Sequence, residues 1–292
     1  MESLSSHERL QRDRRPRRPW LAGLANLIAP PLGHIYTGKP LRGVVLTVVT
    51  TLFGIGAVSL VRWPFGVITV TLMVLVLLIA YAVLIVDSIM VARRFGREYR
   101  LKCYNRLYVY LLVFVVVVTL GDVIKSGVRA YLVQAFRLPA NSMAPTLLIG
   151  DHISADKVAY RSRSPERFEV VVFKFPDDPQ KEMVKRVIGL PGEIIEIREK
   201  KVFVNGKELA EPYAYFTEDE PDKPLPLDVY GPLQIPEHGY VLLGDNRNRS
   251  YDSRFFGPVD RDKIFGQVRL VYFSWDRENS NVRWGRIGKV VE

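Results

Sequence analysis

The chain has 292 residues, of which 48% are hydrophobic and 25% charged, and its formal net charge is +10. This length accommodates a membrane anchor and one globular domain. Residues 1–106 contain 15 Lys and Arg against 5 Asp and Glu, whereas residues 107–292 hold 26 of each. The excess of positive charge therefore lies beside apolar segments, as on the cytoplasmic flanks of membrane spans, which argues against a nucleic-acid partner.

The cysteine and histidine content argues against an intramolecular disulfide and against a metal site. The single cysteine, Cys103, cannot form an intramolecular disulfide. The four histidines are scattered without the spacing of metal ligands: His7, His34, His152 and His238. We expect no metal site and no cofactor.

Three apolar segments follow a basic amino-terminal tail, residues 1–19. They cover about residues 43–61, 66–90 and 107–124, each near the ~20 residues that cross a ~30 Å hydrocarbon core. A weaker segment, residues 20–36, is interrupted by Pro30, Pro31 and Gly33 and has basic residues on both sides. Because flanking charge favours the same side for both ends, we interpret it as a re-entrant or interfacial hairpin.

Charge also predicts the orientation of the membrane region, residues 20–126. The basic clusters within residues 12–18 and 93–106 both favour the cytoplasm. Three crossings then place residues 127–292 outside, as an extracytoplasmic domain. Asp87 is an ionisable residue within a span, and we expect it to pair with Arg93 or Arg94, about a turn or two away.

The sequence pattern of the remainder of the chain is typical of short β-strands. Runs rich in Val, Ile and Phe alternate with turn residues, and Asn205-Gly206 is a strong hairpin signal. The predicted strands are residues 168–175, 182–188, 194–198, 202–204, 240–243 and 267–274. The proline-rich residues 221–236 predict an exposed loop. The expected fold class is therefore a multi-span α-helical membrane anchor followed by a mainly antiparallel all-β domain.

Ser142 and Lys185 are the candidate catalytic pair. A serine hydroxyl is a poor nucleophile until a base removes its proton, and lysine can do so only when it is uncharged. Apolar neighbours surround Lys185 on the predicted strand 182–188, and burial against them lowers an amine pKa. Two alternatives remain: Ser142 as an ordinary turn residue, and Lys185 as an edge-strand lysine pointing into water.

Three segments in order carry a resemblance. Residues 142–147 (SMAPTL), 185–192 (KRVIGLPG) and 244–254 (GDNRNRSYDSR) resemble the motif boxes of bacterial type I signal peptidase (leader peptidase). The likeness covers about residues 131–275 and follows a membrane anchor, as in that family. It implies a signal-peptidase-like β fold and a serine endopeptidase in the bacterial inner membrane, with its catalytic domain on the periplasmic side. The implied partners are preproteins bearing signal peptides, the lipid bilayer and, as a further candidate, the protein export machinery.

The resemblance also implies residue roles. Ser142 matches the nucleophile, Lys185 the general base, and Ser250 the serine that orients the lysine. Asp252 and Arg254 match a structural ion pair behind the site. The substrate has small residues at positions −1 and −3 from the cut. The candidates for the walls of its pockets, which could equally be ordinary core residues, are Phe136, Leu138, Pro139, Met143, Leu147 and Val184.

Three positions depart from the family pattern. Ala140 stands where members carry Ser or Gly, so no hydroxyl is available there for the oxyanion. Asn248-Arg249 replaces the more usual Asp-Asn, and Phe168-Glu169 replaces Gly-Asp before the predicted central strand. Two other classes remain open. One is the self-cleaving repressor family, which carries a DNA-binding domain where this chain has spans. The other is a catalytically inactive, membrane-anchored binding protein.

Overall fold

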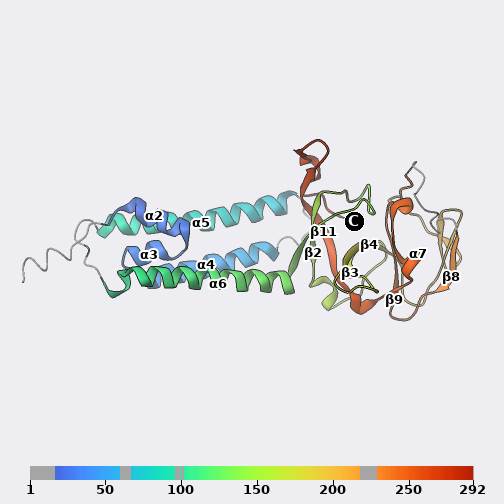
Figure 1. Ribbon diagram of the computed structural model, residues 1–292, viewed down its shortest axis with the longest axis horizontal. Coiled ribbons are helices and arrows are strands. Elements are labelled where there is room, and N and C mark those ends of the chain that lie inside the picture. The colour runs from blue at the N-terminus through green and yellow to red at the C-terminus, as the bar shows by residue number, and fades with distance from the viewer. Residues whose placement is uncertain (1–16, 60–66, 96–98, 100–101, 218–228, 292) are drawn as a thin grey trace, which may run out of the picture. The chain divides into compact units, whose positions relative to one another are not determined.

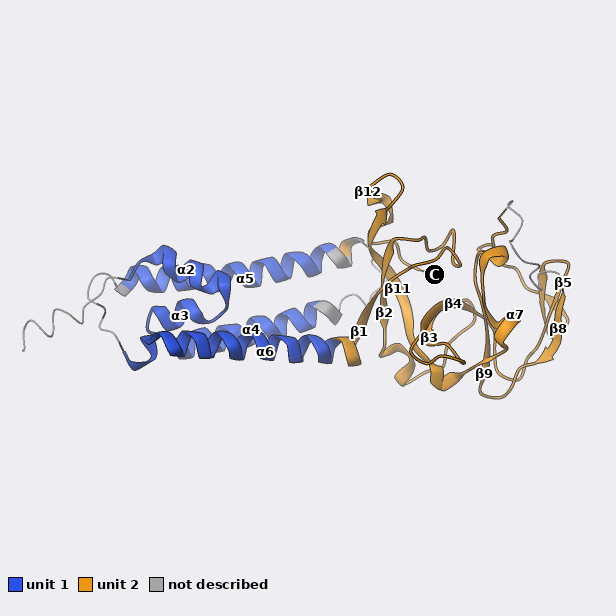
Figure 2. Ribbon diagram, in the orientation of Figure 1, with its two compact units in different colours: residues 1–60, 71–128 blue, residues 61–70, 129–292 orange. Residues whose placement is uncertain are grey.

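The computed structural model describes residues 17–59, 67–95, 99, 102–217 and 229–291. The chain forms two compact units, residues 1–60 with 71–128 and residues 61–70 with 129–292 (Figure 2). The first unit is helical (Figure 1). Its elements are α2 (Pro19–Ile28), α3 (Leu32–Tyr36), α4 (Pro40–Ser59), α5 (Val67–Phe95), the short 3₁₀ turn η2 (Cys103–Asn105) and α6 (Leu107–Tyr131).

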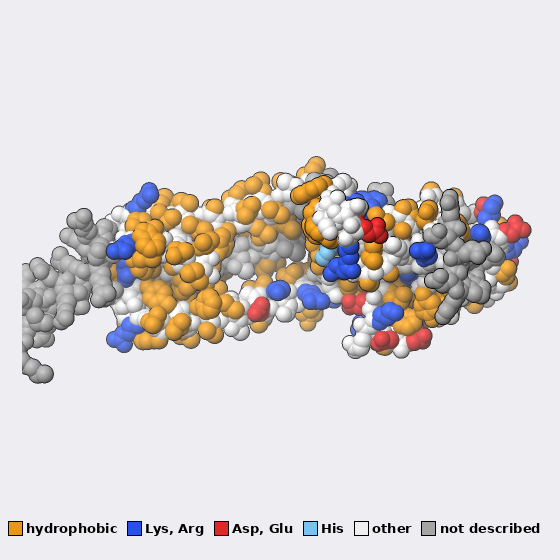
Figure 3. Space-filling view, turned by 45° about the horizontal axis from the view of Figure 1, so that its top comes forward, with side chains coloured by type: hydrophobic (Ala, Val, Ile, Leu, Met, Phe, Trp, Pro, Cys, Tyr) orange, Lys and Arg blue, Asp and Glu red, His pale blue; other side chains and the backbone are white. Residues whose placement is uncertain are grey.

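Three of these helices are candidate membrane spans. Within the described residues, Pro40–Ala57, Thr71–Arg94 and Leu107–Tyr131 are long and apolar enough to cross a bilayer. Figure 3 shows hydrophobic side chains over much of their visible surface. A helix satisfies its own backbone hydrogen bonds, which a lipid environment requires. The predicted segments 43–61, 66–90 and 107–124 fall on α4, α5 and α6, whereas the number of crossings and their direction stay predictions.

A buried polar cluster joins the short helices of the first unit to α5. His34 Nε2 lies 2.7 Å from Asp87 Oδ2, and Arg42 Nη2 lies 2.5 Å from Asp87 Oδ1. Asn26 Nδ2 contacts His34 Nδ1 at 3.2 Å. The expected pairing of Asp87 with Arg93 or Arg94 is therefore wrong. Arg93 and Arg94 follow Asp87 on the same helix by six and seven positions, which corresponds to about 10 Å of rise along the helix axis. The fold instead brings His34 of α3 and Arg42 of α4 to the Asp87 carboxylate.

The second unit is built from two antiparallel sheets. The larger has the strand order β1-β2-β11-β3-β4-β9-β10, with β12 paired to β11, and the smaller has the order β7-β6-β5-β8. The larger sheet consists of β1 (Val133–Arg137), β2 (Asp151–Asp156), β3 (Val170–Lys174), β4 (Glu182–Gly189), β9 (Gly239–Leu243), β10 (Val259–Asp260), β11 (Ile264–Asp276) and β12 (Asn281–Val282). The smaller consists of β5 (Ile194–Arg198), β6 (Lys201–Val204), β7 (Lys207–Glu208) and β8 (Val229–Gln234).

Helical structure is short in the described residues after α6. It comprises one turn of α-helix, α7 (Ser253–Phe256), and the 3₁₀ turns η3 (Ala159–Arg161), η4 (Arg247–Arg249), η5 (Arg261–Lys263) and η6 (Trp284–Arg286). The expectation of a mainly antiparallel β domain agrees with these pairings.

Several strand boundaries differ from the sequence-based prediction. The strand expected from Phe168 begins at Val170, because Phe168 has φ +74°, outside the extended region. Strands β1 and β2 are absent from the prediction, since their alternation is broken by polar residues. The expected loop 221–236 is wrong in part: residues 229–234 form β8, which pairs with β5, while residues 221–228 lie outside the described residues.

Candidate active site

The loop after β1 carries Ser142 and is fixed by its own backbone. The Leu147 N–H donates to the Met143 carbonyl at 2.8 Å, and Ile149 N–H donates to Asn141 Oδ1 at 2.9 Å. A second loop, after β9, holds it from the other side, because Asn246 N–H donates to the Ser142 carbonyl at 3.2 Å. Gly244 allows this approach, since a Cβ there would lie 2.5 Å from that carbonyl oxygen.

Lys185 enters from β4, which lies inside the larger sheet between β3 and β9. Its Nζ lies 2.7 Å from Ser142 Oγ and donates a hydrogen bond to it. The lysine is 1% exposed, so the alternative of an edge-strand lysine in water is wrong. Burial, which penalises the charged form, lowers the pKa of Lys185 to about 8. The site therefore places an alcohol beside an amine that loses its proton near neutral pH.

Comparison with known families shows to which family the chain that carries this pair belongs. The family model described as "Signal peptidase, peptidase S26" matches residues 106–275, more than half of the chain. The chain belongs to the signal peptidase family. The match begins at the third candidate span and contains both Ser142 and Lys185, and it leaves residues 1–105 outside.

Individual relatives are bacterial type I signal peptidases. The "Probable signal peptidase I-2" of Synechocystis sp. is 41% identical over 148 residues, which is 49% of this chain and 64% of the relative, just under two thirds of its length. The "Signal peptidase IB" of Staphylococcus aureus is 33% identical over 59% of this chain and 94% of its own. A solved signal peptidase I from Enterococcus faecalis is 35% identical over 36% of this chain and 97% of its own, with a TM-score of 0.30.

The loop behind Ser142 and Lys185 contains the other three residues of the predicted machinery. Arg254 forms a bidentate pair with Asp252, with Nε–Oδ1 and Nη2–Oδ2 distances both 2.8 Å. Burial acts to raise the pKa of Asp252, but the Arg254 pair outweighs it and holds that pKa below its ordinary value. Asp252 Oδ2 also accepts the Gly244 N–H at 3.0 Å. Ser250 is 2% exposed, and in the described structure no hydrogen bond joins its hydroxyl to Lys185, so its role toward Lys185 stays a prediction.

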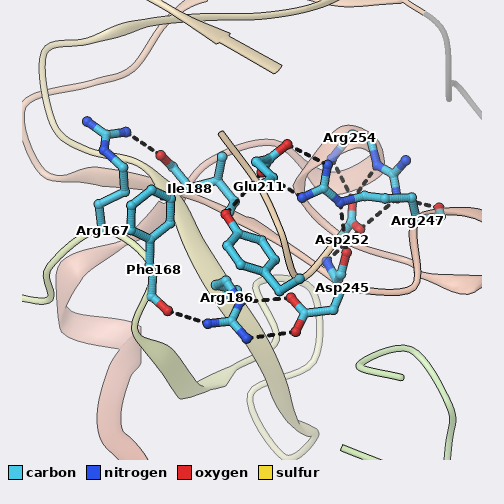
Figure 4. Close-up of polar contacts among 11 residues, drawn as sticks. Arg167, Phe168, Arg186, Ile188, Glu211, Asp245, Arg247, Asp252 and Arg254 are labelled. Carbon is cyan, nitrogen blue, oxygen red and sulfur yellow. Dashed lines mark hydrogen bonds and ion pairs between the residues drawn. The ribbon is translucent and has the colours of Figure 1, made fainter. Parts of the chain in front are cut away.

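A second ion-pair network includes residues of the same loop, and sequence reasoning missed it (Figure 4). Arg186 follows Lys185 on β4 and forms a bidentate pair with Asp245 at 2.9 and 2.8 Å. The Tyr213 ring lies 4.1 Å from the Arg186 guanidinium, and Glu211 forms a bidentate pair with Arg247 at 2.9 and 2.7 Å. The network thus links the strand of Lys185 to the loop that holds Ser142. Charged residues in two of the boxes were the available signal for it.

A cavity of about 440 Å³ is lined by both Ser142 and Lys185. Four of the six predicted substrate residues line it: Phe136, Leu138, Pro139 and Val184. Met143 and Leu147 lie in the hydrophobic core cluster with Leu138 and Val184, where they are 1% and 0% exposed. They therefore belong to the core that packs against the lining residues, and they do not line the cavity themselves. Lining residues absent from the prediction are Arg137, Ala140, Val172, Lys181, Glu182, Met183, Arg249 and Tyr251.

The Glu169 departure has a clear local role. Its carboxylate accepts hydrogen bonds from Arg163 at 2.6 Å, Tyr160 at 2.9 Å and Gln267 at 2.9 Å. Burial acts to raise the pKa of Glu169, but Arg163, the Glu166 N–H and Tyr160 outweigh it and lower that pKa. Glu169, which directly precedes β3, is therefore linked by this hydrogen bond to Gln267 on β11.

Proposed function

We propose that this protein is a membrane-bound serine endopeptidase that removes signal peptides from exported preproteins by means of a Ser142/Lys185 dyad. Family membership supports the activity class, and the 2.7 Å contact between Lys185 Nζ and Ser142 Oγ carries the assignment of the dyad. The cleavage is expected after small residues at −1 and −3.

The chemistry follows from a neutral amine. Lys185 takes the Ser142 proton as Oγ attacks the scissile carbonyl, and the resulting ammonium protonates the amine of the leaving peptide. An ester on Ser142 remains. Lys185, again neutral, takes a proton from water as that water attacks the ester, and the proton returns to Ser142 Oγ when the acid product leaves. One group thus acts as base and as acid in both halves of the reaction.

The oxyanion requires hydrogen-bond donors close to Ser142. Among the described residues, none accepts a hydrogen bond from the Ser142 N–H, which leaves this donor available for the developing charge. Ala140 lines the cavity without a hydroxyl, so a second donor must come from backbone or water.

The substrate fits as an added strand. Within the described residues β1 pairs with β2 alone, so the outer edge of β1, beside the cavity, can pair with an extended peptide. Phe136, Leu138 and Val184 then offer apolar walls that small side chains at −1 and −3 approach without clash. The three candidate spans hold the protein in the bacterial inner membrane as a multi-pass protein, with residues 127–292 on the periplasmic side.

Cleavage of a precursor by the full chain in membranes tests the proposal. A precursor with Ala at −1 and −3 is expected to be processed, and Ser142→Ala or Lys185→Ala is expected to abolish processing. Two exposed residues away from the cavity provide matched controls, Ser162→Ala and Lys207→Ala, which should process normally. Undiminished cleavage by either dyad variant would reject the dyad. Failure of the unaltered chain to cleave would favour the inactive binding protein.

A further inference from the structure

Asn246 contacts the loop of Ser142 through both its backbone and its side chain. Its N–H donates to the Ser142 carbonyl at 3.2 Å, and its side-chain Nδ2 donates to the Asn141 carbonyl at 3.3 Å. These two carbonyls belong to consecutive peptide groups, one on each side of the Ser142 Cα. Asn246 is 3% exposed, so its hydrogen bonds compete little with water. One residue of the loop after β9 therefore holds the backbone on both sides of the proposed nucleophile.

The peptide group between Asn141 and Ser142 carries the N–H that the oxyanion needs. This peptide group is planar and trans, so the Asn141 carbonyl and the Ser142 N–H point in opposite directions from one rigid plane. A donor that binds the carbonyl therefore also sets the direction of the N–H. The Asn141 carbonyl accepts two hydrogen bonds, from the Ala144 N–H at 3.1 Å within the loop and from Asn246 outside it.

A further hydrogen bond orients the Asn246 side chain. Asn246 Oδ1 accepts the Thr217 hydroxyl at 2.9 Å, and this contact directs Nδ2 toward the Asn141 carbonyl. Asn246 also forms a β-bridge with Tyr215, two residues before Thr217. The segment that contains Tyr215 and Thr217 therefore fixes both the backbone and the amide of Asn246.

The two neighbours of Asn246 in the chain are held by buried ion pairs (Figure 4). Asp245, before it, pairs with Arg186, and Arg247, after it, pairs with Glu211. The four charged side chains are at most 7% exposed. Because breaking a buried pair is costly, these contacts restrict the backbone on either side of Asn246. The ion-pair network thus determines where the Asn246 amide lies.

We propose that Asn246 is a positioning residue, which orients the Ser142 N–H toward the oxyanion by holding the peptide groups on either side of Ser142. This role rests on the proposed function, since it requires a reaction at Ser142. Donors that are oriented in advance stabilise developing charge without a cost of reorganisation during the reaction. Ala140 offers no hydroxyl at this site, so the reaction depends strongly on the direction of this one backbone N–H.

The expected effect of losing the amide falls mainly on kcat. In Asn246→Ala the Asn141 carbonyl keeps only its hydrogen bond from Ala144, so the plane of the Ser142 N–H is held less firmly. Loss of a whole oxyanion donor lowers kcat by about 10²–10³, and a misoriented donor should lower it by about tenfold. KM should change by at most about twofold, because the negative charge exists only in the transition state and not in the bound substrate.

Kinetics of the full chain in membranes test the positioning role. We would measure kcat, KM and the pH dependence of cleavage for a precursor with Ala at −1 and −3. Asn246→Ala should lower kcat about tenfold and leave the inflection of the pH profile in place, because Lys185 stays buried. Thr217→Val removes the hydroxyl that orients the amide and should lower kcat about threefold. Thr217→Ser keeps a hydroxyl and should recover most of that loss.

Asn248 provides a matched control two residues further along the chain. It is also buried, but its Nδ2 donates to the Thr217 carbonyl at 2.9 Å, and no hydrogen bond joins its described side chain to the loop of Ser142. Asn248→Ala should therefore lower kcat by at most about twofold.

The outcomes separate the positioning role from the function on which it rests. An unchanged kcat in Asn246→Ala, an equal loss in Asn248→Ala, or a loss accompanied by a shifted pH inflection would overturn the positioning role, while cleavage by the unaltered chain upholds the peptidase. No cleavage by the unaltered chain would overturn both. Should Asn246→Ala fail to fold, the Thr217 variants decide, and equal kcat in Thr217→Val and Thr217→Ser would overturn the role.

Discussion

Two neighbouring basic residues on β4 are both buried, but their side chains meet different partners on the two sides of the strand. Lys185 and Arg186 are each 1% exposed. On one side, Arg186 meets the Asp245 carboxylate, the Phe168 carbonyl at 2.7 Å and the Tyr213 ring (Figure 4). On the other, Lys185 meets the Ser142 hydroxyl, and among the described residues no carboxylate forms an ion pair with it. A paired arginine remains charged, whereas an amine buried without a counter-ion tends to lose its proton.

The same degree of burial therefore has different consequences for the two side chains. The arginine side provides rigidity, because its fork satisfies several acceptors at once. The lysine side fits the base that we propose, because the missing partner makes the charged form costly. Such a site is expected to sacrifice stability for function.

The largest expected effect comes from removing the lysine amine. Lys185→Met should lower kcat at least ~1000-fold through loss of the base. The same variant should be more stable at pH 7. With a pKa of about 8 in the folded state against 10.5 when unfolded, the charged amine costs roughly 3 kcal/mol below pH 8, and the cost fades as pH rises to 10.5.

Urea unfolding of the full chain in detergent checks this stability gain. Lost contacts reduce it, so we expect an increase of about 1–3 kcal/mol at pH 7 that shrinks toward pH 10. Lys207→Met is the control for hydrophobic replacement at an exposed site. A variant that is less stable than the unaltered protein at pH 7 would contradict the idea that Lys185 is held against its preferred state.

The opposite result is expected on the arginine side. Arg186→Met leaves Asp245 buried without its partner, and breaking a buried pair destabilises by roughly 3–5 kcal/mol. Arg186→Met/Asp245→Leu removes both charges and should recover part of that loss. The measurement is again the free energy of unfolding. A single variant that loses less than ~1 kcal/mol would show that the pair contributes little.

An effect of intermediate size is expected in the dependence of cleavage on pH. Because Lys185 acts only when neutral, kcat/KM should rise about tenfold per pH unit below pH 8 and level off above it. The Asp252 carboxylate raises the pKa of Lys185, so Asp252→Asn should move the inflection to lower pH. An inflection that stays in place, or a profile that is flat from pH 6 to 9, argues for a different base.

The smallest expected effect comes from adding a hydroxyl to the lysine side. Ala140→Ser lines the same cavity and supplies a second possible donor to the oxyanion, so kcat should rise about twofold to tenfold with KM unchanged. Ala210→Ser, on an exposed position, is the matched control. A lower kcat would mean that backbone or water already fills that position.

Local patterns in the sequence predict many of the helices and strands. Apolar runs of about 20 residues predicted the helices α4, α5 and α6, and hydrophobic runs between turn residues predicted β4, β5, β6 and β9 to within a residue or so at most ends. These features depend on neighbours in the chain, so they can be inferred without the fold. Strands β1, β2 and β8 could not, because pairing rather than alternation makes them strands.

Composition and motif order are enough to establish that a basic, apolar half precedes a β-rich half, and that the boxes around Ser142, Lys185 and Ser250 follow in order. They do not establish that Asp87 pairs with Arg42 and His34, that Tyr213 stacks on Arg186, or that Lys181 and Arg249 line the cavity of Ser142. Periodicity and motifs act over a few residues of chain. These contacts join residues tens of positions apart, and packing alone brings them together.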